Sequence, residues 1–189
     1  ALTRQNLPQL RDSGEMLSAK GAYCLKAANG ACKVVIIATG SEVEIAIETA
    51  KQLEARGIGT DVVSMPSWSR FMEQADDYRA ALLPADVLKV SIEAGTTFGW
   101  ESITGNDGLR FGIDSFGASA PAEVLYDHFG LTAAKIAPQI KAALGAPVVP
   151  DVQYEFALLR PGGNALLLGP ITGQFCSRQC CLCGEHHRF

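Results

Sequence analysis

A short apolar run near the start of the chain organises the predicted fold. Residues 34–38 are all apolar and four of the five are β-branched, which is typical of a strand covered on both faces. Gly40 permits a tight turn after this strand, and Ser41 with Glu44 three residues later is a capping-box signature for the start of a helix. The predicted helix ends before Gly57, and its apolar stripe consists of Val43, Ala46, Ile47, Ala50 and Leu53.

Strands and helices alternate after this point. A strand over residues 61–65 completes a β-α-β unit, so the two strands are expected to be parallel and joined by a right-handed crossover. Further strands are expected over 87–92 and 109–113. A helix is expected over 73–82, with a buried side made of Ala75, Tyr78, Ala81 and Leu82.

Two more helices are predicted in the last part of this alternating region. The first covers residues 119–130, with Ser119 as its cap, Pro121 in its first turn and Gly130 after its end. The second covers 132–144 and is expected to kink at Pro138, which lacks a backbone N–H.

The first strand of the chain is predicted to lie at an edge of the sheet. Residues 22–26 alternate in strand fashion, and Asn29 with Gly30 indicates a hairpin with a type I′ turn before the next strand. A hairpin would make this strand antiparallel to its neighbour. The sequence therefore predicts an α/β domain with helices on both faces of a largely parallel sheet and one antiparallel edge strand.

The two ends of the chain differ from this body. Residues 9–20 are polar and are predicted to form a linker. From Gly145 onward the local signals no longer agree with one another, and we expect the tail to be poorly ordered or loosely attached. This tail contains a group of possible zinc ligands, Cys176, Cys180, Cys181, Cys183, His186 and His187, but their spacing does not match that of structural zinc sites.

Composition excludes several classes of partner. The 189 residues carry 16 basic and 20 acidic side chains, a net charge of −4, with no basic run to attract a nucleic acid or an acidic membrane. The sequence shows neither a signal-peptide pattern nor an apolar run of about 18 residues. We therefore expect a cytoplasmic protein without nucleic-acid or membrane partners, and a reduced, disulfide-free body containing Cys24 and Cys32.

The body offers few candidates for chemistry. The turn at Gly40 and Ser41 has the free N–H groups of a helix start that bind anions, but capping explains Ser41 better. Glu93 follows a predicted strand and would suit general acid-base catalysis if buried, although an acidic residue there is more often structural. His128 is interpreted as a dipole partner at a helix end. No complete catalytic set and no metal site is predicted in the body.

Two large aromatic residues suggest a partner surface. Trp68 and Trp100 fall in predicted loops, where such side chains are typical anchors of interfaces.

Five segments taken together resemble the closing third of bacterial-type transketolases. They occur in the family's order and at similar spacing over residues 1 to about 144, which is far more specific than a single motif. The segments are Thr3-Arg-Gln-Asn-Leu-Pro8, Ile37-Ala-Thr-Gly-Ser-Glu-Val-Glu44, Val62-Val-Ser-Met-Pro-Ser67, Ser91-Ile-Glu-Ala-Gly95 and Phe116-Gly-Ala-Ser-Ala-Pro-Ala-Glu123. The first and last of these favour transketolases over related thiamine enzymes with a similar final domain.

The resemblance implies a fold and a domain organisation. It implies a three-layer mixed sheet of about five strands, four parallel and one antiparallel at the edge. Residues 1–21 are then the end of an upstream pyrimidine-binding domain with its linker, 22–145 the C-terminal domain, and 146–189 a tail foreign to the family.

The resemblance also implies an activity for a longer parent protein. Transketolases of the pentose phosphate pathway use thiamine diphosphate and a divalent cation, Mg²⁺, to move a two-carbon ketol unit between sugar phosphates. Their cofactor lies between the two upstream domains of a homodimer. Arg4 matches the family arginine that grips the substrate phosphate, a task suited to a permanently charged guanidinium.

Two functions are therefore expected as alternatives. The first is a non-catalytic C-terminal fragment of a transketolase with a structural role in the homodimer, without cofactor or metal of its own. The second is a free-standing module that binds a small anion or nucleotide at Gly40 and Ser41.

Overall fold

The computed structural model describes residues 5–12, 14–145, 157–159 and 165–167. Its main part is a five-stranded sheet in the order β1-β3-β2-β4-β5. All neighbouring strands are parallel except β1 and β3, which are antiparallel. The strands are β1 (Tyr23–Lys26), β2 (Cys32–Ala38), β3 (Gly59–Ser64), β4 (Leu88–Ile92) and β5 (Leu109–Phe111).

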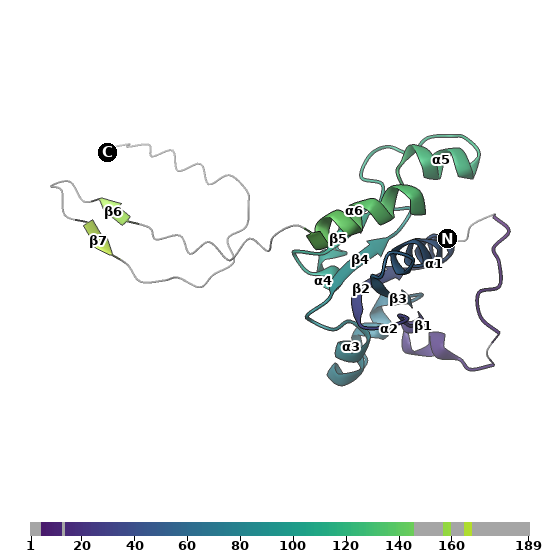
Figure 1. Cartoon of the computed structure of the whole chain (residues 1–189), viewed down its shortest axis with the longest axis horizontal. Helices are drawn as coiled ribbons and strands as arrows, with labels where there is room; N and C mark the ends of the chain where they lie inside the picture. Colours follow the sequence, from purple (N-terminus) through teal and green to yellow (C-terminus); the bar gives the residue numbers. More distant parts are fainter. Residues whose placement is uncertain (1–4, 13, 146–156, 160–164, 168–189) are drawn as a thin grey trace, which may run out of the picture. The chain divides into compact units, whose positions relative to one another are not determined.

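Helices cover both faces of this sheet, as Figure 1 shows. Alternate side chains of the strands point to opposite faces, so Val34 and Ile36 belong to one core and Val35 and Ile37 to the other. The first core is completed by α1 (Glu42–Glu54), α5 (Ala122–His128) and α6 (Ala133–Gly145). The second is completed by α2 (Trp68–Met72), α3 (Asp76–Leu82) and α4 (Glu101–Thr104), with η1 (Leu17–Lys20) before β1. The predicted three-layer α/β fold is confirmed.

The strand that organises the sequence is also the centre of the structure. All five residues from Val34 to Ala38 are 0% exposed. The β2 strand has β3 on one side and β4 on the other, and helices lie above and below it. Complete burial accounts for the uninterrupted apolar run.

The predicted hairpin between the first two strands is wrong. Strand β1 is antiparallel and lies at an edge as expected, but it pairs with β3, because both edges of β2 are already occupied by parallel neighbours. Gly30 does not have the positive φ that a type I′ turn requires. Two acidic side chains that come later in the sequence hold the connection between β1 and β2 instead. Asp61 accepts a 2.7 Å hydrogen bond from the Ala28 N–H, and Glu54 accepts hydrogen bonds of 3.0 and 2.7 Å from the backbone N–H and the side-chain amide of Asn29.

Several predicted helix ends also need correction. The helix expected from residue 73 begins at Asp76, because α2 ends at Met72 just before it. Of the four residues predicted for its buried side, Tyr78 and Leu82, one turn apart on α3, are partly buried, whereas Ala75 and Ala81 are exposed.

The start of α5 differs from the prediction as well. Pro121 has an extended ψ of 143° and occupies the N-cap position, so the helix begins one residue later and Ser119 is too far upstream to cap it. At the other end, Gly130 has a φ of 77°, as expected of a residue that follows a helix. The helix α6 includes Pro138 as predicted, and the kink there stays a prediction.

The chain divides into two compact units, residues 1–146 and 147–189. In the second unit the structure describes β6 (Ala157–Leu159) and β7 (Ala165–Leu167), which pair antiparallel in a separate sheet. These two short strands were not predicted. The remaining tail residues, including the Cys and His group, lie outside the described residues, and the proposed domain limits stay a prediction.

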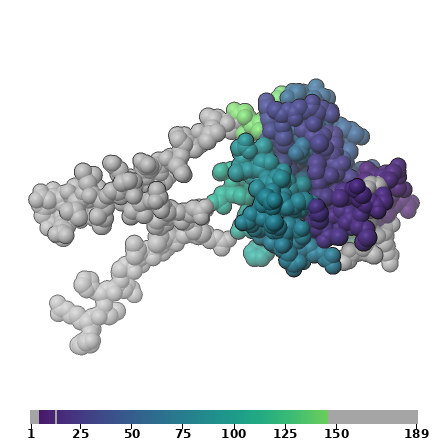
Figure 2. Space-filling view, turned by 90° about the horizontal axis from the view of Figure 1, so that it is seen from below, coloured from purple at the N-terminus to yellow at the C-terminus, as the bar shows by residue number. Residues whose placement is uncertain are grey.

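Segments far apart in the sequence meet in the first unit. Figure 2 shows one face of it, on which purple residues from the start of the chain lie beside teal residues from its middle. Ala22 accordingly shares a core with Trp100 and Ile103. Within the described part of the chain, no helix has both the length and the apolar character needed to cross a membrane.

Candidate functional site

The sheet has a topological switch point between β2 and β4. From β2 the chain passes through α1 to β3 on one side, and from β4 it passes through α4 to β5 on the other. The loops that leave the carboxyl ends of these two strands therefore diverge. Open α/β sheets bind their ligands at such points, and here the two loops contain Gly40, Ser41 and Glu93.

A buried carboxylate lies at the centre of this edge. Glu42, the first residue of α1, is only 4% exposed. Its Oε1 accepts a hydrogen bond of 2.8 Å from the Ser41 hydroxyl and a second, very short one from the Tyr126 hydroxyl. The Ser41 and Tyr126 oxygens are themselves 3.2 Å apart. Ser41, Glu42 and Tyr126 are thus joined in one cluster, although Tyr126 lies 84 positions after Glu42 in the sequence.

The predicted capping role of Ser41 is wrong. Ser41 is the N-cap residue of α1, but its side chain makes no capping hydrogen bond, because the hydroxyl is bound to Glu42 and Tyr126. The first turn of α1 also contains Glu44, so two carboxylates lie where an anion would have to bind. Their charge opposes the binding of an anion at Gly40 and Ser41.

Glu93 lies at the end of β4, near Glu42. Burial first, and then the charge of Glu42, raise the pKa of Glu93 from 4.5 to about 7. Its Oε2 is buried and has no hydrogen-bond partner among the described residues. A carboxyl group with this pKa exchanges its proton near neutral pH, which is the property of a general acid or base.

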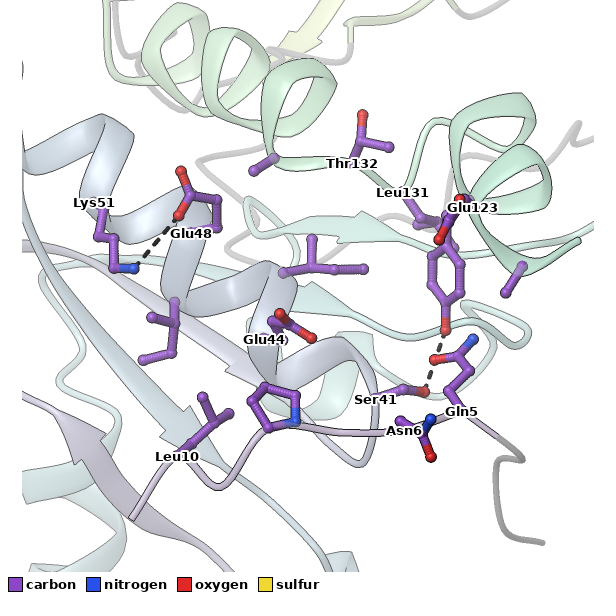
Figure 3. A pocket seen from close by; sticks show the side chains of 16 residues that line it. Gln5, Asn6, Leu10, Ser41, Glu44, Glu48, Lys51, Glu123, Leu131 and Thr132 are labelled. Carbon is purple, nitrogen blue, oxygen red and sulfur yellow. Dashed lines mark hydrogen bonds and ion pairs between the residues drawn. The ribbon is translucent and has the colours of Figure 1, made fainter.

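A shallow groove of about 1010 Å³ opens beside the cluster. It lies between the first described residues, the outer face of α1 and the segment from α5 to the start of α6 (Figure 3). Ile45, Ile47 and Leu131 provide apolar lining, and the charged lining consists of Glu44, Glu48, Lys51 and Glu123. Lys51 is paired with Glu48 at 3.5 Å. The groove therefore has an acidic lining.

Other residues singled out from the sequence lie away from this cluster. Trp100 is 8% exposed and packs in the second core, with its ring centroid 5.4 Å from that of Trp68, the first residue of α2. The prediction that both tryptophans lie in loops is wrong for Trp68, which begins α2, and the interface role is wrong for Trp100, which is buried in the second core. His128 ends α5 beside Phe129, in keeping with the predicted dipole role. Arg4 lies outside the described residues.

The structure identifies functional candidates that the sequence analysis missed. Glu42 lies on the buried side of α1 together with Ala46 and Thr49, which follow one and two turns later. A carboxylate at a position that helical periodicity assigns to the buried side is the feature of the sequence that could have indicated this residue. Nothing in the sequence links Tyr126 to Glu42. The described residues contain no group of three or more His, Cys, Asp or Glu side chains that could hold a metal ion, and Cys24 and Cys32 are both free.

Comparison with known families gives a match over most of the body. Residues 21–132 match the model of the transketolase-like TK C-terminal domain. Two similar proteins are a transketolase of Halalkalibacterium halodurans, 43% identical over 147 residues, and a plasmid-encoded transketolase of Cupriavidus necator, 48% identical over 145 residues. Each alignment covers 76% of this chain but only 22% of the relative. The chain therefore spans about a fifth of the length of the curated relatives it matches.

Solved structures agree with this assignment. A Pichia stipitis transketolase in complex with sedoheptulose 7-phosphate superposes with a TM-score of 0.69 at 36% identity, covering 75% of this chain and 20% of that one. The transketolase of Leishmania mexicana superposes with a TM-score of 0.62 at 41% identity, covering 68% and 19%.

Proposed function

The chain belongs to the transketolase-like C-terminal domain family, and we propose that it is the C-terminal part of a transketolase that is not catalytic by itself. In this proposal residues 22–145 form the C-terminal domain and 1–21 end the domain before it. The observation that carries the proposal is the match over residues 21–132 combined with the small share, about a fifth, of each relative that the chain covers.

We propose that the complete enzyme moves a two-carbon ketol unit from a ketose phosphate to an aldose phosphate. Related transketolases have been solved with xylulose 5-phosphate and with sedoheptulose 7-phosphate, both of which are ketose phosphates. Thiamine diphosphate would supply the chemistry of carbon transfer, with Mg²⁺ as its metal.

The described residues do not fit that cofactor. They hold no metal-binding group of acidic, Cys or His side chains, and Glu42 and Glu44 occupy the helix start at the switch point, where a diphosphate would meet like charge. No step of the reaction is therefore assigned to this domain. Its contribution would be to support the substrate site and the assembly.

Arg4 is proposed to bind the phosphate of the substrate. The residue lies outside the described part of the chain, and the proposal rests on its place in the Thr3-Arg-Gln-Asn segment. A guanidinium makes two parallel hydrogen bonds to phosphate oxygens, which fits a terminal sugar phosphate.

We also propose that the domain takes part in a cytoplasmic homodimer. Phe98 and Phe116 are 89% and 99% exposed, and they come from the loops that follow β4 and β5. Asp114 joins these loops, because its carboxylate accepts hydrogen bonds of 2.8 and 2.6 Å from the N–H and hydroxyl of Thr97. Two highly exposed phenylalanines on joined loops have the character of interface anchors.

An assay of ketol transfer tests the proposed role. The 189-residue chain is mixed with xylulose 5-phosphate, ribose 5-phosphate, thiamine diphosphate and Mg²⁺, and product formation is followed. We expect none, whereas a complete transketolase in the same mixture gives product. Turnover by the chain alone, retained after removal of trace contaminants, would contradict the proposal.

A further inference from the structure

Two carboxylates and two exposed phenylalanines belong to one connected part of the structure at the carboxyl edge of the sheet. We propose that Glu93 is a charge-sensitive latch beside the buried Glu42. While the carboxyl group of Glu93 is neutral, the loops that carry Phe98 and Phe116 stay packed together, and when it ionises the loops are released. The effect of this latch on self-association rests on the proposed homodimer, whereas its effect on the loops does not.

Glu93 is the residue at which the two loops join. Its N–H donates a 3.0 Å hydrogen bond to the carbonyl of Phe111, the last residue of β5. Two residues later, the Gly95 carbonyl accepts a 2.6 Å hydrogen bond from the Ile113 N–H. A Cβ on Gly112 would lie 2.7 Å from the Gly95 oxygen and 3.4 Å from the Glu93 backbone oxygen. The loop after β4 and the segment after β5 are therefore packed directly on each other at Glu93.

A second junction, which we call the clasp, joins the same loops closer to the two phenylalanines. The Asp114 carboxylate accepts hydrogen bonds of 3.0 Å from the Thr96 hydroxyl and of 2.8 and 2.6 Å from the N–H and hydroxyl of Thr97. The Thr96 hydroxyl oxygen in turn accepts a 3.2 Å hydrogen bond from the Phe98 N–H. Phe116 follows Asp114 by two positions. A displacement of the loop at Glu93 is therefore transmitted to both phenylalanines.

Glu42 is the fixed member of the carboxylate pair. It begins α1, and its Oε1 accepts hydrogen bonds from the hydroxyls of Ser41 and Tyr126. Glu93, in contrast, begins a loop, and its buried Oε2 has no hydrogen-bond partner among the described residues. A buried carboxyl group without donors costs far more free energy when it is charged than when it is neutral. Ionisation is therefore relieved by movement of the Glu93 loop toward water, and α1 stays in place.

Glu93 changes its charge near neutral pH, and the titratable groups of the neighbouring elements do not explain the effect. Burial first, and then the charge of Glu42 on α1, raise the pKa of Glu93 to about 7. Hydrogen bonds from Thr97 lower the pKa of Asp114, which follows β5, so that this carboxylate stays ionised. Burial raises the pKa of Tyr126 on α5, so that its hydroxyl stays protonated. Neither Asp114 nor Tyr126 therefore competes with Glu93 as the source of a change between pH 5.5 and 8.

A purely structural cost of the Glu93 charge makes a different prediction. If ionised Glu93 only lowered the stability of the whole domain, the change would be confined to amides that exchange through global unfolding, such as those of the fully buried β2. Loop amides exchange through local opening and would keep their protection. The latch predicts that the N–H groups of Thr97 and Ile113 lose protection. The change should end at Trp100, which is 8% exposed and packs in the second core.

The first experiment measures amide hydrogen exchange by NMR in the 189-residue chain. Wild type is compared at the same pH with Glu93→Gln, which keeps a neutral group of the same shape. At pH 8 the Thr97 and Ile113 amides are expected to exchange roughly fivefold faster or more in wild type, and at pH 5.5 within about twofold of the variant. The control is Glu101→Gln, at the exposed first residue of α4, which should behave as wild type. Equal exchange of wild type and Glu93→Gln at pH 8 would overturn the proposal.

Two further variants test the parts of the latch separately. Glu42→Gln keeps an acceptor for Tyr126 but removes the facing charge, so the loops should be more protected at pH 8 than in wild type. Asp114→Ala opens the clasp whatever the charge of Glu93, so in that background Glu93→Gln should no longer change exchange at Thr97. Unchanged protection in Glu42→Gln would contradict the pairing of the two carboxylates. A full effect of Glu93→Gln without Asp114 would contradict the role of the clasp.

Sedimentation at the same two pH values separates the latch from the proposed homodimer. At pH 8 wild type should associate about tenfold more weakly than Glu93→Gln, and at pH 5.5 the two should associate equally. If neither protein associates at either pH, the proposed homodimer of this chain is wrong, and the exchange data alone decide the latch. If both associate equally at pH 8 although the wild-type loops are released, the latch stands for the loops and its control of association is wrong.

Discussion

Ala38 and Ile92, the last residues of β2 and β4, are direct neighbours in parallel register. Each is fully buried, so the chain leaves the core at both points at the same edge of the sheet. Glu93 follows Ile92 at once, and Glu42 follows Ala38 after a single tight turn. Two carboxylates thereby meet at the edge where sheets of this type place their functional groups.

The first prediction concerns the pH dependence of stability. The pKa of Glu93 is raised to about 7 in the folded protein, so between pH 4.5 and 7 the folded state keeps a proton that the unfolded state has released. Stability must therefore fall as the pH rises through this window. Glu93→Gln removes the effect and should make the protein about 1–2 kcal/mol more stable than wild type at pH 8, after allowance for solvent screening of a partly exposed group.

Urea unfolding at pH 4.5, 6 and 8 checks this prediction. The advantage of Glu93→Gln should be smallest at the lowest pH, where the wild-type carboxyl is protonated in the folded state and about half protonated in the unfolded state. The exposed Glu73 provides the control, because Glu73→Gln should leave the slope of stability against pH unchanged. A wild-type protein that gains stability from pH 5 to 7 through Glu93 would refute the account of this carboxyl group.

The second prediction concerns stability at acidic pH, and here stability changes with pH in the opposite direction to that expected for Glu93. Burial raises the pKa of Glu54, but the hydrogen bonds from Lys26 and then from Asn29 outweigh burial, and the pKa lies below its ordinary value. The resulting stability is present above pH 4.5 and is lost as the pH falls toward the folded pKa. Glu54→Gln should therefore destabilise the protein at pH 7 and have a smaller effect at pH 3. An equal loss at both pH values would show that the charge of Glu54 is not involved.

The third prediction compares two glycines with positive φ. Gly21 has a φ of 84°, and a Cβ there would lie 2.3 Å from the Phe71 nitrogen and 2.4 Å from the Ser67 oxygen. Gly57 has a φ of 75° but open space around it. Gly57→Ala should cost about 1 kcal/mol from backbone strain alone, and Gly21→Ala roughly 3 kcal/mol or more, because backbone atoms must move. Thermal unfolding of the two variants measures the difference, and equal costs would contradict the close approach at Gly21.

The fourth prediction tests the proposed homodimer surface. Phe116→Ser should weaken self-association of the chain at least tenfold in analytical ultracentrifugation without lowering its melting temperature, because the side chain is 99% exposed in the monomer. Met16→Ser, at another position that is 80% exposed, is the control and should leave association unchanged. Equal association constants for wild type and Phe116→Ser would remove this residue from the interface.

The fold could be predicted from the sequence where local signals and burial agree. The run from Val34 to Ala38 is apolar because the strand is buried on both faces. Gly57 follows α1 because its backbone has a positive φ, which glycine adopts readily. Both features could be predicted from the local sequence. The strand that pairs with β1 could not be predicted, because Asn29 and Gly30 are compatible both with a hairpin turn and with a longer connection. Only the inserted strand β3 decides that pairing.

The site was less predictable because its contacts are long-range. Glu93 was found because it follows a strand, a local property. Its raised pKa depends on Glu42, 51 positions earlier in the sequence, and the hydrogen bond of Glu42 comes from Tyr126, 84 positions later. Ser41 was misread for the same reason, since a distant tyrosine engages the hydroxyl that a local motif assigns to capping.

The central claim is that this domain completes a transketolase. The most direct measurement is the rate of ketol transfer by an enzyme in which residues 1–145 replace the corresponding C-terminal residues of the Halalkalibacterium halodurans relative, which is 43% identical over 147 residues. We predict a folded enzyme with kcat within about tenfold of the unmodified relative. A chimera that folds and binds thiamine diphosphate but transfers no ketol unit would contradict the claim.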